Sequence, residues 1–252
     1  MSTTCRFKYV YLNEPEGRGN RGLDYKQHGA ARPDGHAAGT EEGTLEGSVT
    51  PSAPTPSAPS AGWSPANPAP LGLAGFAMTT FVLCVIKANW VSGADVPVVL
   101  GLALAYGGLA QLLAGMWEFR AGNTFGAVAF SSFGAFWISF FVLVMFNAAQ
   151  IVPPGNAGHA IGLYEWAWCI FTFGMTIAAL RTSGAVLLVF VLLTVTFALL
   201  AIGDSGGNMS VTHWGGYFGV ATAIAAWYAA FAQVINSTFG KTVAPLFPLN
   251  KA

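Results

Sequence analysis

The chain has 252 residues, of which 54% are hydrophobic and only 9% are charged. A soluble domain carries about a quarter charged residues, so lipid must cover part of this protein's surface. Three scattered cysteines exclude a disulfide framework and a zinc site. The sequence has no phosphate-binding loop, nucleotide fingerprint or metal-ligand cluster, so we expect no cofactor, no metal, no nucleic acid partner and no enzymatic activity.

The first 62 residues differ from the rest of the chain. They carry six of the eleven Lys and Arg residues and seven of the eleven Asp and Glu residues, among many Gly, Ala, Ser, Thr and Pro residues. Such a segment buries too little apolar surface to offset the chain entropy lost on folding. We therefore expect residues 1–62 to form a disordered cytoplasmic tail ending in a Pro-rich linker, and residues 63–252 to form a transmembrane domain.

The stretch "NPAPLG" joins the two parts and allows two interpretations. Asn67 suits the N-cap of a helix, Pro68 and Pro70 suit its first turn, and Gly72 permits close packing. In the first interpretation the stretch only starts a helix. In the second, the free N–H groups and positive dipole end of that helix bind an anion at a pore mouth, with the Asn67 amide adding donors.

Six apolar runs follow, each long enough to cross a bilayer as a helix. Short breaks with turn residues separate most of them, such as "RAGN", "RTSG" and "GDSGGNMSVTH". The sequence therefore predicts an all-α membrane protein with six transmembrane helices. The runs cover approximately residues 71–89, 96–118, 124–146, 163–180, 184–202 and 214–235.

The basic residues outside the tail predict the orientation of these spans. Arg120, Arg181, Lys241 and Lys251 fall on one side of the membrane, and Lys87 falls on the other. The positive-inside rule places both termini in the cytoplasm. We expect a multi-pass protein of the plasma membrane.

Small residues repeat every four positions on several spans, and this spacing lets helix backbones approach closely. Two such stripes on the last span favour contacts on two of its sides. The pattern fits an oligomer, and it equally fits a tightly packed single bundle. The stripes are Ala127, Ser131, Ala135 and Ser139 on the third span, with Gly215, Gly219 and Ala223 and then Ala221, Ala225 and Ala229 on the last.

The few charged residues near the spans are predicted at span ends, where they can anchor helices at the interface. Glu165 is expected in the first turn of its helix and Arg181 in the last, as the helix dipole favours. The alternative is a vestibule charge or a proton-coupling site, and the lack of a mid-membrane carboxylate favours anchoring. Glu118 is the exception, because it lies slightly deeper in "MWEFRAGNTFG", with Arg120 and Asn123 close by.

Three long motifs resemble the acetate uptake transporter family, which includes bacterial acetate–succinate permeases and fungal acetate/ammonia transporters. They are "NPAPLGLAGFAMTTF", the segment Tyr106–Phe140 and "TVTFALLAIG". The resemblance covers about residues 66–245. It implies a six-helix protomer with its own pore, assembled into a homo-hexamer, which moves acetate and in some members succinate.

The resemblance also implies functional residues. Phe76, Phe133 and Leu193 match the family's hydrophobic pore constriction. Many relatives have Tyr where this chain has Phe133, so a hydroxyl is missing at the narrowest point. Asn67 matches the residue at the pore mouth, and Glu118 the acidic residue that ends the second span.

The function expected from this resemblance is a transporter or channel for acetate and related small carboxylates. A proton-coupled symporter and a passive channel both remain open. Two other functions are compatible with the sequence. One is a passage for ammonia or a neutral weak acid, which a gate of Phe and Leu side chains would allow. The other is a non-transporting membrane receptor for acid stress that signals through the tail.

Overall fold

The computed structural model describes residues 63–146 and 156–249. The predicted tail, residues 1–62, lies outside these described residues. The described chain is helical, and an isolated bridge between Ser183 and Pro248 is its only β-type pairing. Six of its helical segments are long and apolar enough to cross a membrane, so the predicted fold class is confirmed.

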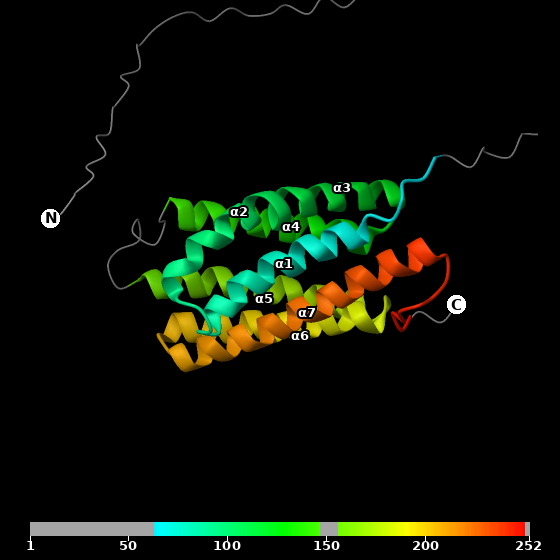
Figure 1. The fold of residues 1–252 in the computed structure, drawn as a ribbon. Coiled ribbons are helices and arrows are strands. Elements are labelled where there is room, and N and C mark those ends of the chain that lie inside the picture. The colour runs from blue at the N-terminus through cyan, green and yellow to red at the C-terminus, as the bar shows by residue number, and fades with distance from the viewer. Residues whose placement is uncertain (1–62, 147–155, 250–252) are drawn as a thin grey trace, which may run out of the picture. The chain divides into compact units, whose positions relative to one another are not determined.

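The helices lie side by side as a bundle (Figure 1). The second span combines four segments, whereas each of the other five is one continuous α-helix. The elements are α1 (Ala69–Lys87), η1 (Gly93–Val98), α2 (Val99–Leu104), η2 (Ala105–Ala110), α3 (Gln111–Ala121), α4 (Thr124–Met145), α5 (Ala157–Ala179), α6 (Gly184–Gly206) and α7 (Met209–Phe239).

The second span is not the uniform α-helix that its hydropathy predicts. It begins as a 3-10 helix around Pro97, continues as α2, and then widens into a turn of π-helix, η2, before α3. A π-turn holds one more residue than an α-turn and is frequent at functional sites. Its effect here is to change the register of the helix directly before Gln111.

The predicted loop between the last two spans is almost absent. The helix α6 continues to Gly206 and α7 begins at Met209, so only two residues connect them. Gly207 adopts a positive φ of 63°, which favours glycine, and the Asn208 side chain accepts hydrogen bonds from the first N–H groups of α7. A left-handed glycine followed by an Asn cap makes this tight turn possible.

The start of α5 also differs from the prediction, and the difference changes the position of Glu165. The helix begins at Ala157 rather than near residue 163, so Glu165 lies in its third turn and not in its first. The early start is stabilised by packing, because Gly158 and Gly162 lie directly against α6. Arg181 lies just beyond the end of α5, after its C-cap Leu180.

Glycines on α7 hold this helix close to both of its neighbours. A Cβ added at Gly216 would overlap the backbone nitrogen of Ala88, at the end of α1. One at Gly219 would overlap the Cys84 sulfur on α1, and one at Gly215 would lie 2.7 Å from the Leu200 side chain on α6. The first small-residue stripe predicted on this span therefore packs helices within the protomer.

The second stripe on α7 has a different environment. Ala221 and Ala225 line an apolar groove between α6 and α7, together with Leu188 and Leu192. Side chains of the described chain do not fill this groove. Two members of the second stripe thus face this groove, whereas its third member, Ala229, is buried inside the bundle.

The segment after α7 turns back along the bundle, which the sequence did not predict. The Asn236 side chain accepts hydrogen bonds from the N–H groups of Val243 and Ala244. Further on, the carbonyl oxygens of Leu246 and Phe247 accept the first N–H groups of α6. Residues 243–249, which we call the C-terminal strap, therefore cap the start of α6.

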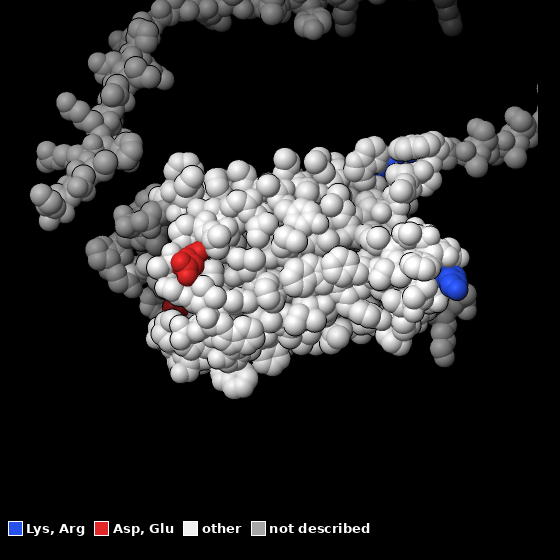
Figure 2. All heavy atoms as spheres, viewed as in Figure 1, with Lys and Arg blue, Asp and Glu red and all other residues white. Residues whose placement is uncertain are grey.

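Charged side chains gather near the two ends of the bundle on the face drawn in Figure 2. Acidic residues lie toward one end and basic residues toward the other, and the surface between them is uncharged. Only nine charged side chains occur after residue 62. An uncharged band between charged ends is what lipid exposure requires.

The packing of α7 on α1 gives a first prediction. Gly216→Ala forces a methyl group into the Ala88 backbone, which cannot yield as a flexible side chain would. We expect the unfolding free energy to fall by about 1–3 kcal/mol or more, measured as a lower melting temperature in detergent. Gly174→Ala on α5 is the matched control, since nothing lies within 4 Å of the added methyl group. Equal melting temperatures for the two variants would contradict the packing.

Candidate functional site

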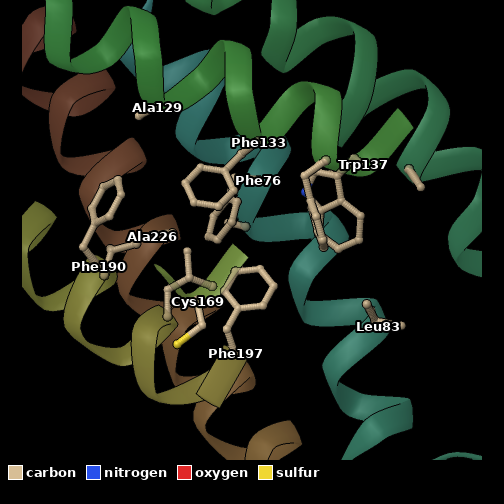
Figure 3. Packing of buried hydrophobic residues seen from close by; sticks show 14 of the residues in the cluster. Phe76, Leu83, Ala129, Phe133, Trp137, Cys169, Phe190, Phe197 and Ala226 are labelled. Atoms are coloured by element: carbon tan, nitrogen blue, oxygen red, sulfur yellow. The ribbon is translucent and has the colours of Figure 1, made fainter. Parts of the chain in front are cut away.

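The three residues proposed to form a constriction come together inside the bundle. Phe76 lies on α1, Phe133 on α4 and Leu193 on α6, and they are only 4%, 2% and 3% exposed. The ring centroids of Phe76 and Phe133 are 5.5 Å apart, as Figure 3 shows for these two side chains. All three line one small cavity. Their role as a constriction remains a prediction.

The cavity between these residues is nearly closed. Its volume is about 20 Å³, and a single water molecule needs about 10–15 Å³ on this measure. A carboxylate with a methyl group therefore passes only if a side chain moves. Phe133 is packed on several sides, with Trp168, Phe171 and Phe190 rings at 5.9, 5.6 and 6.1 Å from its own.

Gln111 lies at the same cavity and was missed in the sequence analysis. It is the first residue of α3, directly after the π-turn, and it is 1% exposed. Its Oε1 atom has no hydrogen-bond partner. A buried polar atom usually has a partner, so one without is open to a ligand or water. The available signal was a single polar residue within the apolar stretch "GGLAQLLAG".

Further unpartnered polar atoms lie one helical turn from Phe76 and Phe133. Thr80 follows Phe76 by four positions on α1, and Trp137 follows Phe133 by four positions on α4, so each shares a helix face with that phenylalanine. The Thr80 hydroxyl and the Trp137 ring nitrogen are buried without partners. Polar groups therefore continue beyond the apolar cavity on the same two helix faces.

Asn67 lies just before α1 and connects two parts of the chain. Its Oδ1 accepts the Ala69 N–H at 3.0 Å, and its Nδ2 donates to Gln233 Oε1 on α7 at 2.9 Å. The N-cap position itself belongs to Pro68, so the assignment of Asn67 as N-cap was wrong by one residue. Pro70 lies in the first turn as predicted.

Gly72 has a packing role at this end of α1. A Cβ at this position would lie 2.6 Å from the Phe130 ring on α4. The glycine therefore brings α1 close to α4, one turn before Phe76. This contact sets the spacing of the two helices that carry Phe76 and Phe133.

Glu118 and Asn123 form a second polar pair at the same end of the bundle. Glu118 is 1% exposed, and its Oε2 accepts a hydrogen bond from Asn123 Nδ2 at 2.8 Å. Asn123 Oδ1 in turn accepts the Gly126 N–H and caps α4. Glu118 Oε1 has no partner. The structure brings these two predicted site residues together, and no described hydrogen bond joins them to Asn67.

Arg120 does not pair with Glu118. It donates a hydrogen bond to the Trp63 carbonyl at 2.8 Å and lies 5.6 Å from the centre of the Trp63 ring. The Trp63 ring also packs against Trp117, at 6.0 Å between centroids. Arg120 therefore holds the segment before α1 in place, while the Glu118 carboxyl remains without a cation among the described residues.

Six membrane-length helices around a small buried apolar cavity, with polar groups on either side of it, define a multi-pass membrane protein of the transporter or channel type. The chain belongs to the GPR1/FUN34/yaaH family, whose sequence profile matches residues 47–251. The predicted family resemblance is therefore confirmed.

Several relatives have been named for their activity. The succinate-acetate/proton symporter SatP of Escherichia coli K12 is 39% identical over 181 residues, which cover 72% of this chain and 95% of the relative. Acetate permease A of Emericella nidulans is 43% identical over 195 residues, covering 72% and 65%. Ammonia transport outward protein 2 of Saccharomyces cerevisiae is 44% identical over 174 residues, covering 67% and 61%. The matches thus span less than two thirds of these two fungal relatives.

The fold is also that of a solved structure. The bacterial acetate channel SatP matches with a TM-score of 0.68 and 38% sequence identity, covering 73% of this chain and 99% of that chain. The structural similarity therefore extends over nearly the whole bacterial chain.

The contacts of Asn67 give a second prediction. Asn67→Ala removes the acceptor for the Ala69 N–H as well as the bond to Gln233. We expect a loss of about 1 kcal/mol of stability, as for other helix N-terminal side chains, seen as a lower melting temperature. Gln233→Leu is the comparison, since it removes the bond to Asn67 and the bond that Gln233 donates to the Ala229 carbonyl, but keeps the contact with Ala69. An unchanged melting temperature in Asn67→Ala would contradict the prediction.

Proposed function

We propose that this protein carries acetate and related small carboxylates across the membrane through a path inside each protomer. The observation that carries the proposal is the convergence of Phe76, Phe133, Leu193 and Gln111 on one cavity within the bundle. The names of the relatives support the substrate class, since these include an acetate permease, a succinate-acetate/proton symporter and an acetate channel.

The mouth of the path lies at the end of the bundle where α1 begins. The Asn67 Nδ2 atom has a second N–H beyond the one donated to Gln233, and the positive end of the α1 dipole favours an anion. The backbone N–H groups of Ala69 and Leu71 are already bonded, and Pro70 has none. The Asn67 amide and the helix dipole are therefore the features of this helix start that favour a carboxylate. Pro68, Pro70 and Gly72 shape this start, and Glu118 and Asn123 lie at the same end.

The cavity selects by size and by polarity. A small methyl group is compatible with walls made of Phe76, Phe133 and Leu193, whereas a sugar would find neither space nor hydrogen bonds. Gln111 offers one polar contact beside these walls. Its amide donates to a carboxylate oxygen and also accepts from the O–H of an undissociated acid. A single side chain can thus hold either protonation state of acetate.

A second candidate function is the passage of ammonia. It is favoured by the name of the yeast relative that is 44% identical to this chain, and by a cavity large enough for a molecule the size of water. Ammonia would use the Gln111 carbonyl oxygen as its acceptor. A non-transporting receptor for acid stress gains no support from the described residues.

The proposal includes the membrane, the orientation of the termini and the oligomeric state. We place the protein in the plasma membrane with both termini in the cytoplasm, because Arg120, Arg181 and Lys241 lie at the end of the bundle where α1 begins.

We also propose a homo-hexamer, in which the apolar groove between α6 and α7 receives a neighbouring protomer. Cross-linking in native membranes tests the assembly, and labelling of single introduced cysteines tests the orientation. The proposal assigns no enzymatic step and no cofactor.

The gate gives a third prediction, tested by radiolabelled acetate uptake into proteoliposomes. Leu193→Ala removes one wall of the cavity, so uptake of a larger monocarboxylate such as lactate should rise relative to acetate. Val191→Ala is the matched control on the same helix, because Val191 is 42% exposed and lines neither the cavity nor the groove between α6 and α7. An unchanged lactate-to-acetate ratio in Leu193→Ala at normal protein yield would exclude this gate.

Gln111 gives a fourth prediction. Gln111→Leu keeps the volume nearly constant and removes both the donor and the acceptor at the cavity. We expect acetate uptake to fall about tenfold, the effect of one lost hydrogen bond of about 1.4 kcal/mol. The melting temperature should not fall, because Gln111 Oε1 has no partner in the protein. Acetate uptake at the wild-type rate would contradict a role for this amide.

A further inference from the structure

At the end of the bundle opposite the proposed mouth, three ionisable side chains from three helices meet. Lys87 is the last residue of α1, and its Nζ lies 2.6 Å from Asp204 Oδ2 in the last turn of α6. The other Asp204 oxygen, Oδ1, accepts a hydrogen bond from the Thr212 hydroxyl of α7 at 2.8 Å. Both oxygens of this carboxylate are therefore engaged.

The third member of this group is Glu165, from α5. It follows Gly162 by three positions, so it lies on the side of α5 that packs against the last turn of α6, where Asp204 lies. Glycines bring the two helices together there, since a Cβ at Gly162 would overlap the Ser205 side chain. Glu165 is only 8% exposed, and its Oε2 has no hydrogen-bond partner.

The charges in this group do not balance when all three residues are ionised. Lys87 supplies one positive charge, and Asp204 and Glu165 supply two negative charges. Lys87–Asp204 is the only ion pair among the described residues, so Glu165 has no cation of its own. Two neighbouring carboxylates with one ammonium bind a proton readily, because the proton removes the repulsion between them.

We propose that Lys87, Asp204 and Glu165 form a proton-binding site, in which one proton is shared by the two carboxylates, and that its occupancy sets the acetate flux. The inference rests on the proposed function for its effect on flux, and on the cluster alone for proton binding. Without the proton the cluster carries one net negative charge and repels acetate at this end of the path. With the proton it is neutral, so acetate passes more readily.

Three other titratable side chains lie on the helices around the cluster. On α5, the Tyr164 hydroxyl is 2.6 Å from the Ser139 hydroxyl of α4, and His159 is exposed in the first turn. On α7, His213 follows Thr212.

The cluster is also connected to the gate through α5. Trp168 follows Glu165 by three positions and therefore lies on the same side of the helix, about one turn away. Its ring lies 5.9 Å from that of Phe133, which lines the cavity. A change in the position of α5 at Glu165 would therefore reach the gate through two packed aromatic rings.

The test is the acetate current across planar bilayers as the pH on the cluster's side is lowered at constant acetate anion concentration. Neutral acetic acid crosses lipid without current, and strong buffer on both sides holds the pH against the protons that it carries. The wild type should conduct several-fold more at acidic pH than at neutral pH. Glu165→Gln should conduct at the high level at both pH values, because an amide resembles the protonated carboxyl. His159→Gln, the control, should keep the wild-type profile. A wild-type pH profile in Glu165→Gln would overturn the proposal.

A second measurement tests proton binding without transport. The melting temperature of the detergent-purified protein is recorded against pH for the wild type, Glu165→Gln and His159→Gln. The wild type and His159→Gln should share a pH-dependent change that Glu165→Gln lacks. If no variant conducts acetate, the proposed function fails, and this profile still decides whether the cluster binds a proton. Identical profiles for the wild type and Glu165→Gln would overturn the site itself.

Discussion

The bundle depends on how closely α7 approaches α1 and α6. In lipid no hydrophobic effect drives helices together, so close packing and polar contacts must do it. Because Gly216 and Gly219 have no side chains, α7 lies directly against the end of α1. Gly215 allows the same close approach of α7 to α6. The helices α1 and α6 carry Phe76 and Leu193. The width of the central cavity is therefore set by glycines on a third helix that contributes no residue to its lining.

Buried polar groups are the other constraint on this chain. Most polar side chains inside the bundle are satisfied locally, as when Thr172 and Thr196 donate to a carbonyl one turn earlier. Atoms of Gln111, Glu118 and Glu165 are not satisfied in this way. They lie at the cavity, at the end where α1 begins and at the opposite end. Unsatisfied buried atoms are costly, and their distribution along the bundle is the pattern expected of a path for a polar solute.

Hydropathy and length were enough to predict the six spans, because each had to cross the same thickness of lipid. Their ends were harder to predict. The early start of α5 depends on glycines that fit against α6, and the tight turn after Gly206 depends on the cap at Asn208. The π-turn before Gln111 has no periodic signal in the sequence. The positions of Phe76, Phe133 and Leu193 came from the family resemblance, since nothing in their spacing indicates that three separate helices bring them together.

The C-terminal strap has a consequence for how the protein is made. The N–H groups of Gly184 and Ala185 find their acceptors at Phe247 and Leu246, which are synthesised after all six spans. During insertion these two N–H groups must therefore remain hydrated, or be held by another partner, until the strap has been made. Closure of that end of the bundle thus follows the synthesis of α7. A nascent chain stopped before the strap would contain all six spans and keep only the Ser183 side chain as the cap of α6.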